Sequence, residues 1–139
     1  MPARHKARKR ALDLLYETEI KGLPLSEIWQ QRVDAENLPT HEYTEAIVLG
    51  LSLNQDLVDS KISSVSTDWR LDRMSPVDRS ILRIAVYEIL FRPEVDLAVV
   101  INESILLAQE ISGDNAPAFI NGVLGAISRL PEAVNRSAV

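Results

Sequence analysis

The sequence predicts an all-α fold. Apolar residues recur at spacings of three and four along nearly the whole chain, which is the spacing of one helix face. Pro and Gly separate these periodic stretches, and no alternation of apolar and polar residues lasts long enough to indicate a strand. The 139 residues suffice for one domain with a single hydrophobic core. We therefore expect one compact helical domain over residues 1–139.

Turn residues delimit the first two helices. A first helix is expected over residues 3–21, because Gly22-Leu23-Pro24 follows it. A short second helix follows and ends at Leu38-Pro39. The inner faces of these helices are expected to carry Ala7, Ala11, Leu14, Leu15 and Thr18 in the first, and Leu25, Ile28, Trp29 and Val33 in the second.

A long third segment and a central helix form the middle of the chain. Thr40 is a candidate N-cap for the third segment, and residues 54–56 are a candidate break within it. Ser75 as an N-cap and Pro76 at the first helical position indicate the start of a helix that continues to about Phe91. That helix is apolar nearly all round, so we expect other helices to surround it. The stripe of the third segment consists of Tyr43, Ile47, Leu51, Val58, Ile62 and Val65.

Two further helices are expected after the central one. Asp96 is a candidate N-cap for the first of them, and Gly113 is a candidate left-handed residue at its end. The last helix begins near Pro117, with Asn115 as its candidate cap, and ends before Pro131.

The composition excludes several classes of site. The chain has no cysteine, which removes disulfides, thiolate zinc sites and cysteine nucleophiles and favours a cytoplasmic location. The two histidines, His5 and His41, belong to no metal-binding motif, and the five glycines form no phosphate-binding loop. The longest apolar run, residues 97–101, is too short to cross a membrane. We expect no enzymatic activity, no cofactor and no bound metal.

The charges are distributed unevenly along the chain. Residues 11–139 contain ten Lys and Arg against twenty Asp and Glu, a net charge of −10. Such a body repels phosphate, so a nucleic acid is expected to meet the protein only at its basic N-terminal helix. The first ten positions contain five of the fifteen cations and no acid, the cations being Arg4, Lys6, Arg8, Lys9 and Arg10.

These cations fall on a helix beside an aromatic ring. At about 100° of rotation per residue, His5, Lys9 and Tyr16 share one line of the first helix, and Lys6 and Arg10 share the next. This arrangement suits single-stranded RNA, because cations contact phosphates while an unpaired base stacks on the ring. Two simpler interpretations stay open: Arg10 could pair with Asp13 or Glu17, and Tyr16 could pack against a neighbouring helix.

A second concentration of arginines surrounds the start of the central helix. Arg79 and Arg83 are candidate supporting contacts to RNA, together with Arg70 and Arg73. Because Arg79 and Arg83 are four residues apart on one face, they could equally pair with acids and solvate that face.

Four blocks of the sequence resemble the NusB family of transcription antitermination factors. The resemblance extends across nearly the whole chain, and the order and spacing of the blocks are specific. They are A-R-H-K-A-R-K-R-A-L-D-L-L-Y at 3–16, D-R-S-I-L-R-I-A-V-Y-E-I-L at 78–90, V-I-N-E-S-I-L-L-A-Q-E at 100–110 and F-I-N-G-V-L at 119–124.

The resemblance implies seven helices in two small subdomains, here residues 22–66 and 75–130, with the arginine-rich helix at 1–21. It implies binding of single-stranded boxA RNA on the RNA polymerase elongation complex with other Nus factors, chiefly in ribosomal RNA operons. It also implies a protein partner, the small-subunit ribosomal protein NusE, which strengthens binding to boxA. By position, it places Asp78 and Phe119 near the RNA bases, in addition to the basic residues and Tyr16.

Other positions in the resembling blocks carry different expectations. Asn102, Glu103 and Asn121 are expected to be structural and to satisfy backbone groups between helices. Asn115 stands where family members often have a second acid, so a contact that depends on that charge stays open. Asp96 stands where members often have proline, which affects a helix start more than function.

Two alternatives and one question of assembly remain open at the level of sequence. A similar helical unit forms the N-terminal part of a ribosomal RNA cytosine methyltransferase, although we expect no room for a catalytic domain before Val139. The chain could also be a protein-only adaptor whose basic helix contacts acidic partners, and a salt titration of RNA binding separates these functions. Some family members form homodimers that bury the RNA-binding surface, and a homodimer is possible here.

Overall fold

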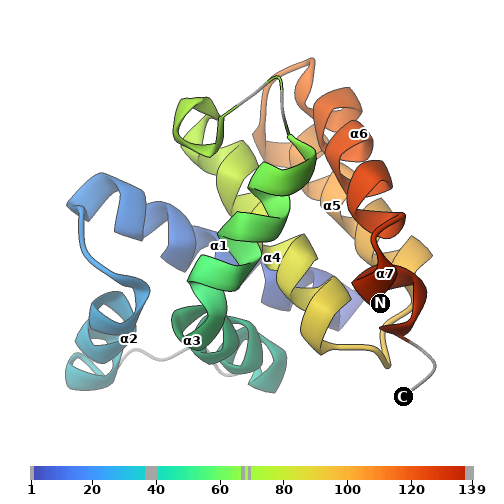
Figure 1. Ribbon diagram of the computed structural model, residues 1–139. Helices are drawn as coiled ribbons and strands as arrows, with labels where there is room; N and C mark the ends of the chain where they lie inside the picture. Colours follow the sequence, from blue (N-terminus) through green and yellow to red (C-terminus); the bar gives the residue numbers. More distant parts are fainter. Residues whose placement is uncertain (1, 37–40, 67, 69, 137–139) are drawn as a thin grey trace.

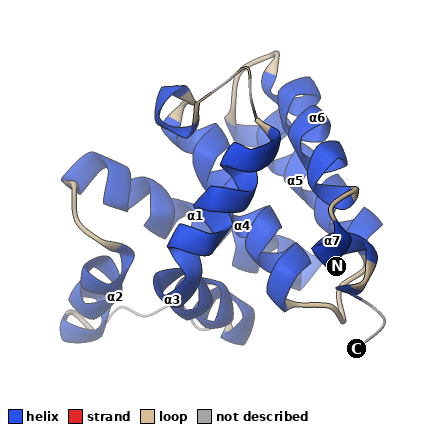
Figure 2. Ribbon diagram, viewed as in Figure 1, coloured by secondary structure: helices blue, strands red, loops and turns tan. Residues whose placement is uncertain are grey.

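The computed structural model describes residues 2–36, 41–66, 68 and 70–136. Over these residues the chain forms seven α-helices, one short 3-10 helix and no strand (Figures 1 and 2). The all-α prediction is therefore confirmed. No helix in the described part of the chain is both long and apolar enough to span a membrane.

The central helix of the bundle is α4, as the sequence predicted. It contacts α1, α3, α5, α6 and α7, whereas α2 lies at the edge of the molecule and packs on α1 and α3 (Figure 1). Nine of the sixteen residues of α4 are buried, because neighbours cover it on several sides. The elements are α1 Pro2–Lys21, α2 Leu25–Asp34, α3 Glu42–Val65, η1 Leu71–Arg73, α4 Pro76–Phe91, α5 Leu97–Ile111, α6 Ala116–Ser128 and α7 Pro131–Val134.

One hydrophobic cluster joins the helices from α1 to α7. The predicted inner faces supply most of it, but Thr18 is only partly buried and Val33 is exposed, because α2 packs at the edge of the bundle. The predicted core positions that are fully buried are Ala7, Ala11, Leu14, Leu15, Leu25, Ile28, Tyr43, Ile47, Leu51, Val58 and Ile62.

Several predicted helix boundaries are confirmed by local geometry. Gly22 ends α1 with a φ of 66°, a left-handed conformation that glycine adopts without steric cost. The Ser75 hydroxyl caps α4 by accepting the Asp78 N–H at 3.2 Å. Asn54 has a non-helical φ of −127° and kinks α3, while its amide donates to the Gly50 carbonyl at 2.9 Å.

Other predicted caps are wrong in detail. Asp96 and Asn115 occupy the N-cap positions of α5 and α6, but neither side chain accepts a capping hydrogen bond. Gly113 is not left-handed, because α5 already ends at Ser112, whose N–H donates to the Ala108 carbonyl at 2.9 Å.

The start of α3 also differs from the prediction. Thr40 lies outside the described residues, so its predicted role as a cap is not tested. The cap of α3 is His41, whose Nδ1 accepts the Tyr43 N–H at 3.0 Å.

The crossing of α3 and α4 requires glycine at position 50. A Cβ atom there would lie 2.3 Å from three atoms of the Tyr87 side chain, which is far inside van der Waals contact. The ring of Tyr87 is itself buried and stacks on Phe91 at a centroid distance of 5.4 Å. The two helices therefore approach closely because Gly50 has no side chain.

Candidate nucleic-acid interface

The exposed surface of α1 includes Lys6, Arg10 and Tyr16. Lys6 and Arg10 are exposed, and neither has an acidic partner within ion-pair distance among the described residues. Glu17, the suggested partner for Arg10, bonds instead to Lys21 and Arg32. Tyr16 is 41% exposed, so its ring is open to a ligand. The exposed part of α1 thus carries positive charge and an aromatic ring.

Arg8 differs from its neighbours because it points into the core. Its side chain is 2% exposed and donates to Glu88 from Nε at 3.0 and 3.1 Å and from Nη2 at 2.7 Å. The Tyr43 hydroxyl donates to the same carboxylate at 2.5 Å, and burial raises the pKa of Tyr43 well above its usual range. A guanidinium that is buried and held by a bidentate ion pair is not available to a phosphate. Arg8 therefore lies outside the exposed face, unlike the sequence prediction.

Arg4 lies at the border between the core and the exposed face. It is partly buried, and its guanidinium lies 4.6 Å from the centre of the Tyr43 ring. Arg8 and Arg92 lie 5.5 and 5.3 Å from the same ring centre, so three cations from α1 and the end of α4 surround one aromatic residue of α3. These contacts fix the orientation of the first turn of α1.

His5 and Lys9 are exposed to solvent in part, but acids of α5 bind them. The His5 ring contacts Glu103 at 2.5 Å through Nδ1 and Glu110 at 2.7 Å through Nε2. Lys9 Nζ donates to the other oxygen of Glu110 at 3.0 Å. The hydrogen bonds from Lys9 and His5 lower the pKa of Glu110. No sequence signal indicated these pairs, because about a hundred residues separate their members.

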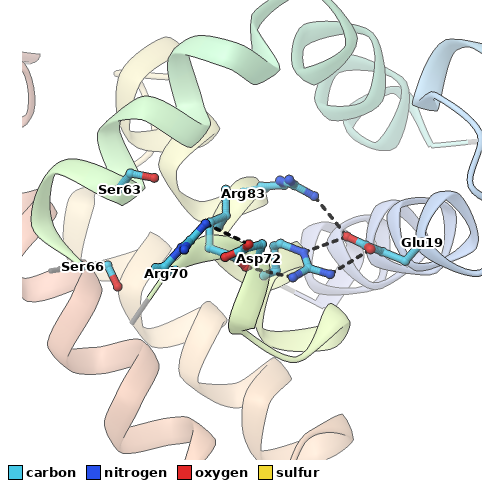
Figure 3. Close-up of a pocket in the computed structure, with 8 residues that line it drawn as sticks. Glu19, Ser63, Ser66, Arg70, Asp72 and Arg83 are labelled. Atoms are coloured by element: carbon cyan, nitrogen blue, oxygen red, sulfur yellow. Dashed lines mark hydrogen bonds and ion pairs between the residues drawn. The ribbon is translucent and has the colours of Figure 1, made fainter. Parts of the chain in front are cut away.

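Arg79 and Arg83 line a cleft of about 670 Å³ and are occupied by acids (Figure 3). Arg79 donates to both oxygens of Glu19 at 2.8 Å and to two backbone carbonyls. Arg83 donates to Asp59 at 2.8 and 3.0 Å and to Glu19 at 3.3 Å. The bonds from Arg79 lower the pKa of Glu19. Both arginines thus connect helices, which matches the simpler of the two sequence interpretations.

A second cleft contains the two remaining predicted residues, Asp78 and Phe119. Its volume is about 690 Å³, and Asp78 accepts the Ser112 hydroxyl at 2.5 Å at its wall. Asn115, which stands where an acid was expected from the resemblance, also lines it. Sequence reasoning missed the apolar and small residues that complete the cleft, because no motif sets them apart: Met74, Val77, Ile111, Gly113 and Ala116.

The three polar residues expected to be structural have different surroundings. Asn102 and Asn121 are exposed, so a buried role for them is wrong. Glu103 is partly buried and holds His5. Within the described part of the chain, no group of three acidic or histidine side chains is placed to hold a metal ion.

The sequence is similar to known proteins over most of its length. The family model described as "NusB family" matches residues 5–129. A transcription antitermination protein NusB of Salinispora tropica is 46% identical over 131 residues, which cover 92% of this chain and 96% of the relative. One from Thermobifida fusca is 41% identical and covers 94% of this chain and 89% of the relative.

Solved structures show the same fold. NusB of T. maritima superposes with a TM-score of 0.82 at 27% identity, covering 98% of this chain and 97% of that one. A chain from the structure of antitermination factors NusB and NusE in complex with dsRNA superposes with a TM-score of 0.77 at 28% identity, covering 91% and 96%. With the family model, the curated relatives and the fold in agreement over nearly its full length, this chain belongs to the NusB family.

Proposed function

We propose that this protein is a transcription antitermination factor that binds boxA RNA together with NusE on the RNA polymerase elongation complex. The observation that carries the RNA part is the exposed surface of α1, where Lys6 and Arg10 have no acidic partner among the described residues and Tyr16 is 41% exposed. The similar chain in the solved structure of NusB and NusE in complex with dsRNA supports this part of the proposal. The role is binding in the cytoplasm, without catalysis.

The RNA surface consists of unequal parts. Lys6 and Arg10 contact phosphates directly, and Tyr16 stacks on a base. The cleft that contains Asp78 and Phe119 offers an acceptor and a second ring for bases. Arg8, Arg79 and Arg83 are outside this surface, because their donors are already bonded to acids.

Lys6→Ala with Arg10→Ala tests the proposal. RNA affinity should fall, and the slope of log K against log salt for a boxA-like single strand should become less negative by about 1.4, since each lost phosphate contact contributes about 0.7. The control is Lys21→Ala with Arg129→Ala, which removes two cations, one at the C-terminal end of α1 and one at the C-cap of α6. Equal affinity and slope for wild type and the Lys6–Arg10 variant, measured by fluorescence anisotropy, would contradict the RNA role of α1.

The acidic body supports a basic protein partner such as NusE. Residues 33–60 contain six acids and no Lys or Arg, and the chain outside the first ten residues has a net charge of −10. A cationic partner that covers part of this surface removes its repulsion for phosphate and adds contacts of its own. Affinities for partner and RNA should rise together, because coupling between two ligands is reciprocal.

Titration of RNA into the pair tests this part separately. We expect a gain of at least about tenfold, or about 1.4 kcal/mol, over this chain alone. A complex that leaves RNA affinity unaltered, or no complex at micromolar concentration, would remove the partner from the mechanism but leave RNA binding by α1 intact.

A further inference from the structure

Two carboxylates of α5 already occupy part of the cationic face of α1. His5 lies between Glu103 and Glu110, with ring nitrogen to oxygen distances of 2.5 and 2.7 Å, and Lys9 reaches Glu110 at 3.0 Å. Glu110 therefore receives one bond on each of its two oxygens, one from His5 and one from Lys9. A phosphate group with two accessible oxygens would make the same two bonds.

Glu103 and Glu110 differ in their exposure to solvent. Glu103 is 13% exposed and lies 4.0 Å from the buried Arg8, so it is held within the fold. Glu110 is 39% exposed and its partner Lys9 is 48% exposed, so both can exchange this bond for another. Exposed ion pairs of this kind are weak and are screened by salt. Glu110 is thus a removable ligand on two cations that share a line of α1 with Tyr16 of the proposed RNA surface.

The hydrogen-bond chemistry of His5 strengthens the competition. Both ring nitrogens of His5 face a carboxylate oxygen, Nδ1 that of Glu103 and Nε2 that of Glu110. When RNA replaces Glu110, His5 keeps its bond to Glu103 and presents Nε2 to the phosphate.

We propose that Glu110 competes with RNA phosphate for His5 and Lys9 and thereby limits the affinity of α1 for RNA. This inference rests on the proposed RNA-binding function. Weak, nonspecific polyanions would displace Glu110 poorly, whereas an RNA that also engages Lys6, Arg10 and Tyr16 would displace it. Glu110 thus lowers the affinity for RNA, because it neutralises positive charge on α1 until a ligand that makes several contacts displaces it.

Glu110→Gln tests the competition directly, because it removes the charge and keeps the size of the side chain. Binding of a boxA-like single-stranded RNA is measured by fluorescence anisotropy at several salt concentrations. We expect about threefold to tenfold tighter binding at low salt, from the release of two exposed ionic contacts. The slope of log K against log salt should become more negative by up to about 0.7, because Lys9 can then contact a phosphate without first leaving the Glu110 carboxylate. The melting temperature should stay near that of wild type.

Two controls separate competition from a general loss of negative charge. Asp72→Asn removes an equally charged, exposed and ion-paired acid, bound to Arg70 at 3.2 Å, and should leave RNA affinity nearly unchanged. In a background of His5→Ala and Lys9→Ala, the effect of Glu110→Gln should disappear, because the cations for which Glu110 competes are gone.

The three ways in which this experiment can fail are distinguishable. If wild type binds RNA and Glu110→Gln binds it equally well, the competition is overturned while the proposed function stands. A gain that persists without His5 and Lys9, or that Asp72→Asn reproduces, also overturns the competition, because charge alone would explain it. If neither wild type nor Glu110→Gln binds RNA at low salt, the proposed function and this inference both fail.

Discussion

Arg8 of α1 and Glu88 of α4 form a bidentate ion pair inside the hydrophobic core, with exposed fractions of 2% and 1%. Eighty residues separate them in the sequence. The Tyr43 hydroxyl of α3 completes the set of donors to Glu88, so three helices meet at one carboxylate. The pair fixes the basic helix on the body of the protein, and its role is to position α1.

The first prediction concerns this pair. Arg8→Ala should lower the free energy of unfolding by about 3–5 kcal/mol, because it leaves the buried Glu88 charge without its cation. Arg8→Met combined with Glu88→Leu should be less destabilising than Arg8→Ala, since no unpaired charge stays in the core. Urea denaturation followed by circular dichroism measures both. A loss below about 1 kcal/mol for Arg8→Ala would show that the pair is not structural.

Tyr16 should act through its ring. Tyr16→Phe should retain RNA affinity, and Tyr16→Ala should lose about 1–3 kcal/mol of binding free energy, the range for one base–aromatic stack. Because the side chain is 41% exposed, the melting temperature of both variants should stay close to wild type. Equal losses of affinity in both variants would assign the role to the hydroxyl, and a large drop in melting temperature for Tyr16→Ala would assign the residue to the core.

Glu19 should make stability depend on acid pH. Its hydrogen bonds with Arg79 lower the pKa of its carboxyl from 4.5, so the charged form is favoured in the folded state. The resulting stabilisation is complete above about pH 4.5 and is lost as the pH falls through the lowered pKa. Glu19→Gln should therefore be less stable than wild type by about 1–3 kcal/mol at pH 7, and the two should converge in acid. Chemical denaturation at about pH 7 and about pH 3 checks this, and a constant difference would contradict it.

Gly50 should tolerate no side chain, in contrast to a glycine elsewhere on the surface. Gly50→Ala places a Cβ 2.3 Å from the Tyr87 ring and should destabilise the fold by about 1–3 kcal/mol. Gly122 in α6 is exposed, and a Cβ at that position would meet no other atom within 4 Å, so Gly122→Ala should stabilise by up to about 1 kcal/mol through helix propensity. Thermal denaturation compares the two, and effects of the same sign would contradict the close approach at Gly50.

Much of the fold can be predicted from local patterns in the sequence. The spacing of apolar residues predicted the helices, because a helix with one buried face has apolar residues at intervals of three and four. The central position of α4 was predicted because a helix buried on several sides is apolar nearly all round. Gly22 and Ser75 predicted helix ends, since left-handed backbone and a capping hydroxyl depend on neighbours within a few residues. The same spacing predicted that His5, Lys9 and Tyr16 share one line of α1 and that Lys6 and Arg10 share the next.

The helical class, the central helix and the basic, aromatic character of the first helix are thus predictable from residue spacing and composition. Which cations of that helix are available depends on the tertiary packing. Arg8 and Lys9 are adjacent in the sequence. Arg8 is buried in an ion pair with Glu88, whereas Lys9 is exposed and paired with Glu110. Those acids come from α4 and α5, and their positions depend on how distant helices pack. The strength of an ion pair depends on the distance between the two charges and on their burial. The helical period gives only the face of the helix on which each residue lies.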